Sequence, residues 1–233
     1  MAPPPAAAAP EVAPTARGVA AKAAAVWIVL PLFFLATGGS LAWWEAWAYC
    51  AVLLVPMTVF LIHMARHDPQ ILARRLKARE KEGAQRRIQA WGSVAFLAAL
   101  VLPGLDHRFG WSHPPRAAVV AALAVALGSY LAVLWVFLVN RWAGRTVETC
   151  ADQEVISTGP YAIVRHPMYA TTSILYLATP VALGSWWALL PALTIVPVFI
   201  LRILNEEKVL LRELPGYEEY RRKVRFRLVP YIW

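Results

Sequence analysis

Charged residues are scarce in this chain. Asp, Glu, Lys and Arg make up 16% of its 233 residues, whereas 59% are hydrophobic and eleven are tryptophan. A soluble domain has about 25% charged residues, so this deficit excludes an ordinary soluble globule and indicates a polytopic membrane protein. The two cysteines, Cys50 and Cys150, have no CxxC partner and offer no disulfide framework.

Several common catalytic signatures are also missing. The sequence contains no GxGxxG, no P-loop, no HExxH and no serine-nucleophile elbow. A nucleotide-like cofactor would therefore need a site other than a Rossmann unit. His63 and His67 are spaced i, i+4, but without further ligands they are predicted to lie at the membrane interface, and no metal site is predicted.

The net charge of +9 is concentrated in two blocks. Residues 66–87 and 202–227 hold much of the Lys and Arg, and each block directly follows an apolar run. This is the pattern of cytoplasmic loops under the positive-inside rule. It argues against a nucleic-acid partner, which a basic stripe on a soluble face would favour.

Long apolar runs predict an all-α, polytopic helical bundle with about six (five to six) transmembrane helices. The third run is short because Pro103 and Gly104 interrupt it, and 106–116 is expected to be a compact polar connection. Pro180, Pro191 and Pro197 are expected to bend the last hairpin. The expected spans are Val26–Thr37, Trp43–Met64, Trp91–Leu105, Ala117–Val139, Met168–Leu183 and Trp186–Leu204.

This topology divides the chain into three regions. Residues 1–16 form a Pro/Ala-rich tail predicted to be disordered, residues 17–139 hold helices one to four, and residues 140–233 form a C-terminal catalytic region. Six spans place both ends and both basic blocks on one side, predicted to be cytoplasmic. After Pro69, a helix lying on anionic lipid and a solvated loop are both open.

Two polar clusters interrupt the apolar pattern of the last region. Arg165 and His166 precede Pro167, which suits the first turn of a helix, and together they favour an anion. The alternative is a headgroup anchor that snorkels. Glu206 and Glu207 close the next run, and adjacent helical residues point about 100° apart. One of them is therefore expected to face a ligand such as a ribose, and the other to pair with an Arg, unless both begin a solvated tail.

These clusters resemble the isoprenylcysteine carboxyl methyltransferase family, which is related to membrane phospholipid N-methyltransferases. The resemblance covers about residues 140–233, and the DHRFGW and DPQIL stretches at 106–111 and 68–72 look like bacterial members. Ala170 departs from the Gly that often follows RHPxY in the family. The motifs that carry the resemblance are GPYAIVRHPMY at 159–169, NEE at 205–207, LPGYEEY at 214–220 and VRFRLVP at 224–230.

The resemblance implies an integral membrane enzyme that uses S-adenosyl-L-methionine, with a lipophilic or lipidated acceptor entering from the bilayer. His166 and the helix start at Pro167 would meet the methionine part of the cofactor, and Tyr169 would line the pocket. One of Glu206 and Glu207 would hold the ribose. The backbone of Gly159, Pro160 and Tyr161 would close over the adenine, together with the ring of Tyr217 or Tyr220.

The acceptor class stays open between a carboxylate, an amine and a thiol. A lipid carboxylate is ionised at pH 7 and needs only an Arg to hold it, for which Arg165, Arg225 and Arg227 are candidates. An amine or thiol needs a base, for which His166 and the two glutamates are candidates. The spare cations favour a carboxylate, so the predicted catalytic residues are Arg165, Glu206 and Arg225.

Two other classes compete with a methyltransferase. A small transporter subunit would place ionisable residues along the middle of its spans, and the third to fifth spans have none there. A membrane sterol-type reductase, which resembles this superfamily near its C-terminus, would bind NADPH. The remaining expectations are contact with membrane lipids, no obligate protein partner, and a bacterial inner-membrane location with the site cytoplasmic.

Overall fold

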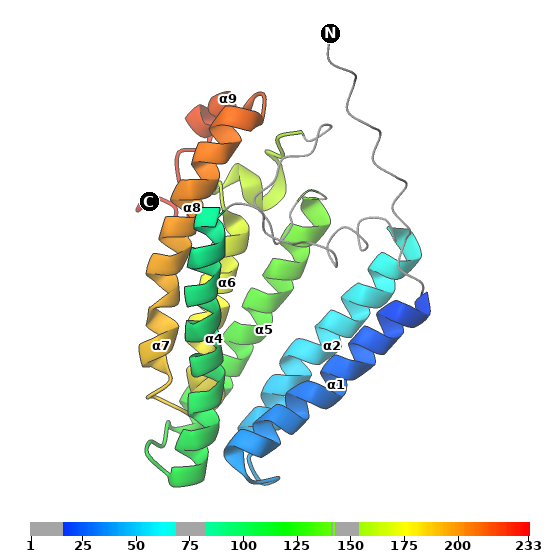
Figure 1. The fold of residues 1–233 in the computed structure, drawn as a ribbon, viewed down its shortest axis with the longest axis vertical. Coiled ribbons are helices and arrows are strands. Elements are labelled where there is room, and N and C mark those ends of the chain that lie inside the picture. The colour runs from blue at the N-terminus through cyan, green and yellow to red at the C-terminus, as the bar shows by residue number, and fades with distance from the viewer. Residues whose placement is uncertain (1–15, 69–82, 141, 143–153) are drawn as a thin grey trace.

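The computed structural model describes residues 16–68, 83–140, 142 and 154–233, and the secondary structure of this part of the chain consists of helices joined by turns and loops (Figure 1). The predicted all-α class is confirmed. Residues 1–15, the segment after Pro69 and Cys150 lie outside the described residues. The helices are α1 (Ala16–Gly38), α2 (Trp44–His67), α4 (Gly83–Phe109), α5 (Arg116–Val139), α6 (Pro167–Ala182), α7 (Leu189–Leu193), α8 (Ile195–Glu213) and α9 (Tyr217–Lys223).

Five helical segments are long and apolar enough to cross a membrane: Ala20–Gly38, Trp44–His67, Ala90–Phe109, Arg116–Val139 and Leu189–Glu213. The last of these combines α7 and α8. The span predicted fifth, Met168–Leu183, corresponds to α6, which has 16 residues and is not among these five. At about 1.5 Å per residue it is about 24 Å long, shorter than a hydrocarbon core of about 30 Å. The bundle is a polytopic one, as predicted.

Two boundaries differ from the predictions. The third span was expected to end at Leu105 and to be interrupted by Pro103 and Gly104, but α4 continues through both residues to Phe109. A Cβ at Gly104 would overlap Thr37 Oγ1, so this glycine lets α1 and α4 pack closely. The last span was expected to end at Leu204, but α8 continues to Glu213, which places Glu206 and Glu207 inside the helix. The expected polar connection at 106–116 and the charged tail are shorter for this reason.

The helices define two ends of the molecule (Figure 1). The α9 end holds α9, the end of α2, the start of α6 and the end of α8. The distal end holds the α1–α2, α4–α5 and α6–α7 connections. The α1–α2 hairpin meets the other helices at the distal end and diverges from them toward the α9 end.

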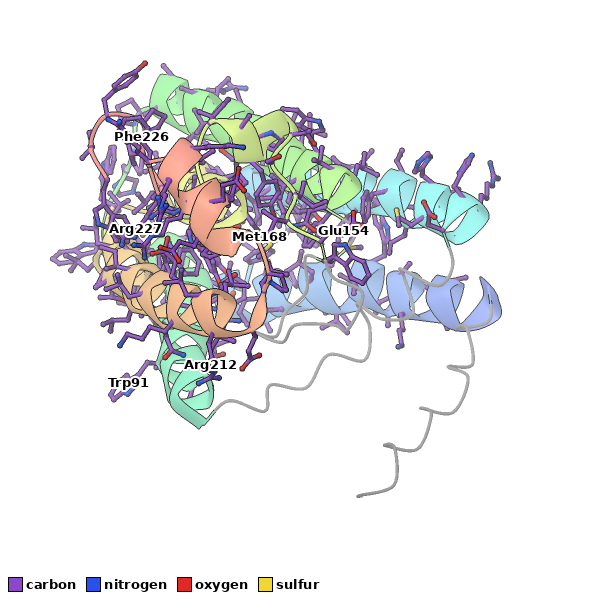
Figure 2. All side chains as sticks on the ribbon, turned by 90° about the horizontal axis from the view of Figure 1, so that it is seen from above. Trp91, Glu154, Met168, Arg212, Phe226 and Arg227 are labelled. Atoms are coloured by element: carbon purple, nitrogen blue, oxygen red, sulfur yellow. The ribbon has the colours of Figure 1, made fainter. Side chains whose placement is uncertain are left out.

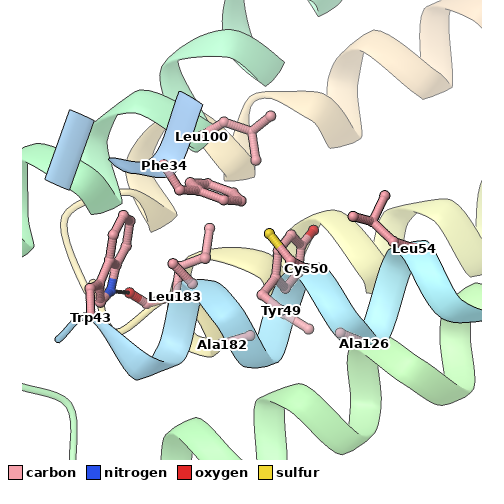
Figure 3. Packing of buried hydrophobic residues seen from close by; sticks show 11 residues of the cluster. Phe34, Trp43, Tyr49, Cys50, Leu54, Leu100, Ala126, Ala182 and Leu183 are labelled. Atoms are coloured by element: carbon pink, nitrogen blue, oxygen red, sulfur yellow. Dashed lines mark hydrogen bonds between the residues drawn. The ribbon is translucent and has the colours of Figure 1, made fainter. Parts of the chain in front are cut away.

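An apolar core fills the distal half of the bundle (Figure 3). The fully buried Phe34 and Trp43 rings meet edge to face, with centroids 5.6 Å apart. Trp43 Nε1 donates to the carbonyl oxygen of Leu183 at 3.2 Å. The Tyr49 hydroxyl is 2.7 Å from Thr179 Oγ1. These contacts fasten α2 to the end of α6.

A buried carboxylate joins the distal connections. Asp106 is fully buried and accepts from the backbone N–H of Ser112 at 2.6 Å and from the hydroxyls of Ser112 and Ser185, both at 2.5 Å. His107 stacks on Trp43 with ring centroids 5.1 Å apart. Since Asp106 belongs to α4, Ser112 to the following loop and Ser185 to the α6–α7 turn, one carboxylate holds three segments in place.

Candidate functional site

The residues Arg165–Tyr169, called the RHPMY loop below, are held against the last residues of the chain by two backbone hydrogen bonds. The N–H of Arg165 donates to the carbonyl oxygen of Phe226, and that of His166 donates to Arg227, both at 2.9 Å. His166 is the N-cap of α6, and Pro167 occupies the first turn as predicted. The loop and residues 226–227, sixty positions apart in sequence, therefore form one structural unit.

Glu207 is the centre of a buried ion cluster. Its Oε1 accepts from Arg165 Nε at 2.7 Å and lies 3.4 Å from His166 Nε2, and its Oε2 accepts from Arg227 Nε at 2.9 Å. Glu207 is 4% exposed and Arg165 6%. A buried charge is tolerated only with several good partners, and this carboxylate has them. Both carboxylate oxygens of Glu207 are therefore occupied by contacts with protein side chains.

Arg165 connects this cluster to the loop after α9. Its Nη1 donates to the carbonyl oxygens of Val224 and Arg225, both at 2.8 Å. Arg165 thus bonds a carboxylate and two carbonyls in one buried arrangement, which its planar, multi-donor guanidinium is suited to do. The Arg225 side chain itself is exposed, so only its backbone is part of the cluster.

Glu206 faces a different neighbour. Its Oε2 accepts from the Tyr169 hydroxyl at 2.7 Å, and Arg202 Nε donates to the same hydroxyl at 2.8 Å. Within the described ranges, Oε1 of Glu206 has no hydrogen-bond partner. The two adjacent carboxylates therefore separate as the helical geometry predicts, one bound to arginines and one with an oxygen available.

The sequence prediction missed Arg202. A usable signal was present, because Arg202 precedes Glu206 by four residues and both lie on one face of α8. Phe199 is on the same face, with its ring 5.2 Å from that of Tyr169. The pairing across to α6 depends on how the two helices cross, which no spacing within α8 reveals.

The tyrosines after α8 have different roles. The Tyr220 hydroxyl donates to the carbonyl oxygen of Tyr161 at 2.7 Å. Tyr217 is 4% exposed, and its hydroxyl has no partner among the described residues. Burial raises the pKa of both phenols, so both stay protonated at neutral pH. The amide nitrogen of Asn205 is likewise buried without a partner in the described part of the chain.

The turn that precedes the RHPMY loop packs on the end of α5. Gly159 has φ +58°, and a Cβ there would lie 3.4 Å from Val139. Pro160 is buried in the short 3₁₀ helix Gly159–Ala162. The amide of Asn140 donates to the Tyr161 hydroxyl at 2.9 Å. The structure thus brings the predicted residues into one region, except for the Arg225 side chain.

Two cavities in the described residues lie away from this cluster. A polar cavity of about 130 Å³ is at the distal end, beside Glu45, Asp106 and His107. An apolar cavity of about 360 Å³ lies between α1 and α4, beside Val29 and Leu97. The stacked pair His63 and His67, 4.4 Å apart, is exposed at the end of α2.

A family model described as phospholipid methyltransferase matches residues 117–215. The matched stretch is less than half of the chain, and it includes the RHPMY loop and both α8 glutamates. Tyr217, Tyr220 and Arg227 lie beyond it. A search of curated proteins found no match to the chain. The family match supports an integral membrane methyltransferase, and it supports the predicted resemblance at the level of the related membrane methyltransferases.

Proposed function

We propose that this chain is an S-adenosyl-L-methionine-dependent membrane methyltransferase that acts on a lipophilic acceptor entering from the bilayer. Residues 140–233 would form its catalytic region on the cytoplasmic side of a bacterial inner membrane. The observation that carries the proposal is that two adjacent carboxylates, Glu206 and Glu207, have different hydrogen-bond partners. Glu207 is bound by Arg165 and Arg227, while one oxygen of Glu206 and the buried polar atoms of Asn205 and Tyr217 have no partner among the described residues.

The residues at this site fit the chemistry of the cofactor. The vicinal hydroxyls of a ribose donate hydrogen bonds, and a carboxylate such as Glu206 can accept them. Buried polar atoms without partners cost free energy, about 1–3 kcal/mol each, and Tyr217 and Asn205 would regain it by bonding a ligand. The α6 N-terminus at Pro167 favours a carboxylate group. When bound, the cofactor would supply an electrophilic methyl group.

The protein's contribution would be positioning. Arg202 and Tyr169 fix the rotamer of Glu206 by consecutive hydrogen bonds of 2.8 and 2.7 Å. The Glu207 cluster fixes the RHPMY loop relative to residues 224–227. Methyl transfer is an in-line displacement, and correct alignment of the reacting atoms lowers its barrier by several kcal/mol, up to about 7–11.

For the acceptor, we propose first a lipid carboxylate of the isoprenylcysteine type, with Arg165 and Arg225 orienting it. The contacts of Arg165 and Arg227 with Glu207 leave less of their donor capacity for such an acceptor. An amine acceptor, such as a phospholipid amine, is the second candidate, and the family match is equally consistent with it. An amine or a thiol would need a proton acceptor, and His166 is the candidate, since Glu206 is assigned to the ribose and Glu207 is bound by two arginines.

Ligand binding by the purified protein in detergent tests the cofactor assignment. S-adenosylhomocysteine is expected to raise the unfolding temperature, and NADPH is not. Stabilisation by NADPH alone would replace the proposal with a reductase. A methylation screen of lipid extracts with labelled cofactor then identifies the acceptor as a carboxylate, an amine or a thiol.

The two carboxylates are separated by matched substitutions. Glu206→Gln is expected to weaken S-adenosylhomocysteine binding about 10- to 100-fold with little change in stability, because it removes a charge-assisted hydrogen bond to the ligand. Glu218→Gln, an exposed residue on α9, is the control. Unchanged affinity in Glu206→Gln would show that the ligand contacts another group.

A further inference from the structure

Residues 226–233 fold back on themselves as a compact hook. The main-chain oxygen of Trp233 accepts three backbone N–H groups, from Arg227 at 2.8 Å, Leu228 at 3.0 Å and Val229 at 3.3 Å. The N–H of Trp233 in turn donates to the carbonyl oxygen of Val229 at 3.1 Å. These bonds close the hook between its first and last residues.

The first part of the hook holds the site through Arg227. Its guanidinium donates to Glu207 at 2.9 Å, and its carbonyl oxygen accepts from the N–H of His166, also at 2.9 Å. The same guanidinium lies over the Trp233 ring, 5.2 Å from the ring centroid. Trp233 therefore contacts both the backbone and the side chain of the residue that binds Glu207 and His166.

The tip of the hook is apolar and exposed. Tyr231 is 90% exposed and Ile232 80%, and Val229 is also exposed. Tyr231 has φ +65°, a left-handed conformation that costs a non-glycine residue roughly 1–2 kcal/mol. Its ring packs against that of Phe226, with centroids 5.2 Å apart, and the residue is otherwise mostly open to its surroundings. Such a strained conformation persists where contacts with neighbouring groups compensate for its cost. The exposed Tyr231 receives few such contacts from the protein.

The position of the hook points to lipid. Figure 1 shows the end marked C beside α8 and below α9, at the flank of the bundle. Figure 2 shows Phe226 and Arg227 at the edge of the bundle, on the side away from α1 and α2. The nearby Arg221 and Arg225 side chains are exposed and basic, which suits an anionic headgroup layer. Tyrosine is a typical interfacial residue.

We propose that the hook inserts Tyr231 and Ile232 into the headgroup–acyl boundary of the bilayer and thereby holds Arg227 against Glu207 and His166. Trp233 is then a positioning residue, and the surface of the tip is a lipid contact. That the hook lies near a bilayer rests only on the helices that are long and apolar enough to span a membrane. Its effect on cofactor affinity rests on the proposed function. In this arrangement, lipid stabilises the strained tip and the hook transmits that order to the site.

Depth measurement tests the lipid contact. Ile232→Cys, made in a Cys50→Ala, Cys150→Ser background, is labelled with an environment-sensitive fluorophore in nanodiscs of phosphatidylethanolamine and phosphatidylglycerol. We expect quenching by a shallow doxyl lipid and protection from aqueous iodide. Arg222→Cys on the exposed face of α9 is the control, with the opposite pattern expected. Iodide quenching of both sites, without doxyl quenching at 232, would overturn the proposal.

Amide hydrogen exchange tests the coupling. Trp233→Ala and Ile232→Asp are expected to speed exchange of the His166 amide about threefold to tenfold, because one cation–π contact or the lipid anchor is lost. Trp233→Phe keeps a ring and is expected to restore most of the protection. Leu41→Asp, at an exposed apolar position in the distal turn, is the control for an added charge.

Unchanged exchange at His166 in both hook variants would refute the coupling. S-adenosylhomocysteine affinity in nanodiscs is expected to fall in the same variants by a similar factor. If the wild-type protein binds no S-adenosylhomocysteine, the proposed function fails, while the quenching and exchange results still decide the role of the hook.

Discussion

The two ends of the bundle each bury one carboxylate, but they satisfy it by different means. Asp106 at the distal end accepts from two serine hydroxyls and a backbone N–H, whereas Glu207 at the α9 end is held by two arginines and a histidine. The neutral donors around Asp106 come from the connections at the distal end, and they hold these connections together. Charged donors come from long side chains that reach across several elements, and these same elements form the candidate site.

The ends also differ in packing. At the distal end, Gly104 admits Thr37 so closely that no side chain would fit, and a fully buried Trp43 fastens α2 to the end of α6. At the α9 end, two polar atoms are buried without partners in the described chain. In the described chain, the buried polar groups of the distal end are therefore satisfied by protein contacts, whereas the α9 end retains hydrogen-bonding groups that a ligand could use.

Removing the charge from Glu207 is expected to have the largest effect. Glu207→Gln leaves the buried Arg165 and the partly exposed Arg227 against a neutral amide, and breaking a buried ion pair costs about 3–5 kcal/mol. Thermal unfolding in detergent, with urea titration, measures the loss. S-adenosylhomocysteine binding is expected to disappear together with the order of the RHPMY loop. A stable protein with normal affinity would show that the cluster is dispensable.

The same change at the other end is expected to cost less. Asp106→Asn keeps the shape but offers a serine hydroxyl a weaker acceptor and places an amide N–H against a donor, for a loss of about 1–3 kcal/mol. Ligand affinity of the folded protein is expected to be unchanged. A parallel loss of affinity would mean that the two ends are coupled through the bundle.

Close packing at the distal end is tested by Gly104→Ala. The added methyl would overlap Thr37 Oγ1, and overpacking costs about 1–3 kcal/mol. Gly128→Ala on α5 is the control, because nothing lies within 4 Å of a Cβ there, and a change within about 0.5 kcal/mol is expected. The double variant Gly104→Ala, Thr37→Ala is expected to recover part of the loss, which a double-mutant cycle measures.

The smallest expected effects distinguish two neighbouring tyrosines. Tyr220→Phe loses a hydrogen bond to the Tyr161 carbonyl oxygen, which costs about 1 kcal/mol of stability. Tyr217→Phe removes a hydroxyl without a partner in the described chain, so stability is expected to be unchanged or slightly higher while ligand affinity falls. Isothermal titration and unfolding of both variants check this, and a swapped pattern would contradict the assignment.

These phenols also predict a pH dependence. Burial raises the pKa of Tyr217 and Tyr220 in the folded protein, so above about pH 10 the unfolded chain releases protons that the folded chain retains. Their contribution to stability is therefore constant from pH 7 to 9 and decreases as the pH rises further. Unfolding of the wild type and the double Tyr→Phe variant across this range measures it.

The sequence was sufficient to predict the features that depend on an uninterrupted apolar or helical pattern. Ala117–Val139 was predicted as a span and α5 runs Arg116–Val139, because nothing within it opposes a helix. The splitting of Glu206 and Glu207 between different neighbours follows from the helical angle alone. Pro103 was predicted to interrupt the third span, yet α4 continues past it. The close packing of α4 on α1 at Gly104 depends on a second helix, which the sequence of one segment does not reveal.

Other features depend on contacts between distant segments. The partners of Asp106 lie in two separate connections, and the hydroxyl that joins Arg202 to Glu206 comes from another helix. The hook at 226–233 has neither helical nor strand periodicity, and its shape is set by a few main-chain bonds and by Arg227. No local propensity encodes these arrangements, so the sequence named many of the participants without their pairings.

The short length of α6 has a consequence for how an acceptor reaches the site. If α6 is about 24 Å long in a core of about 30 Å, and its last residue, Ala182, lies at the opposite boundary of the core, its first residue lies below the plane where lipid headgroups begin. An acceptor with a hydrocarbon tail would then meet the site without being lifted from the membrane. Extraction costs about 0.8 kcal/mol per methylene, so even a few angstroms of recess spare a long-chain acceptor several kcal/mol.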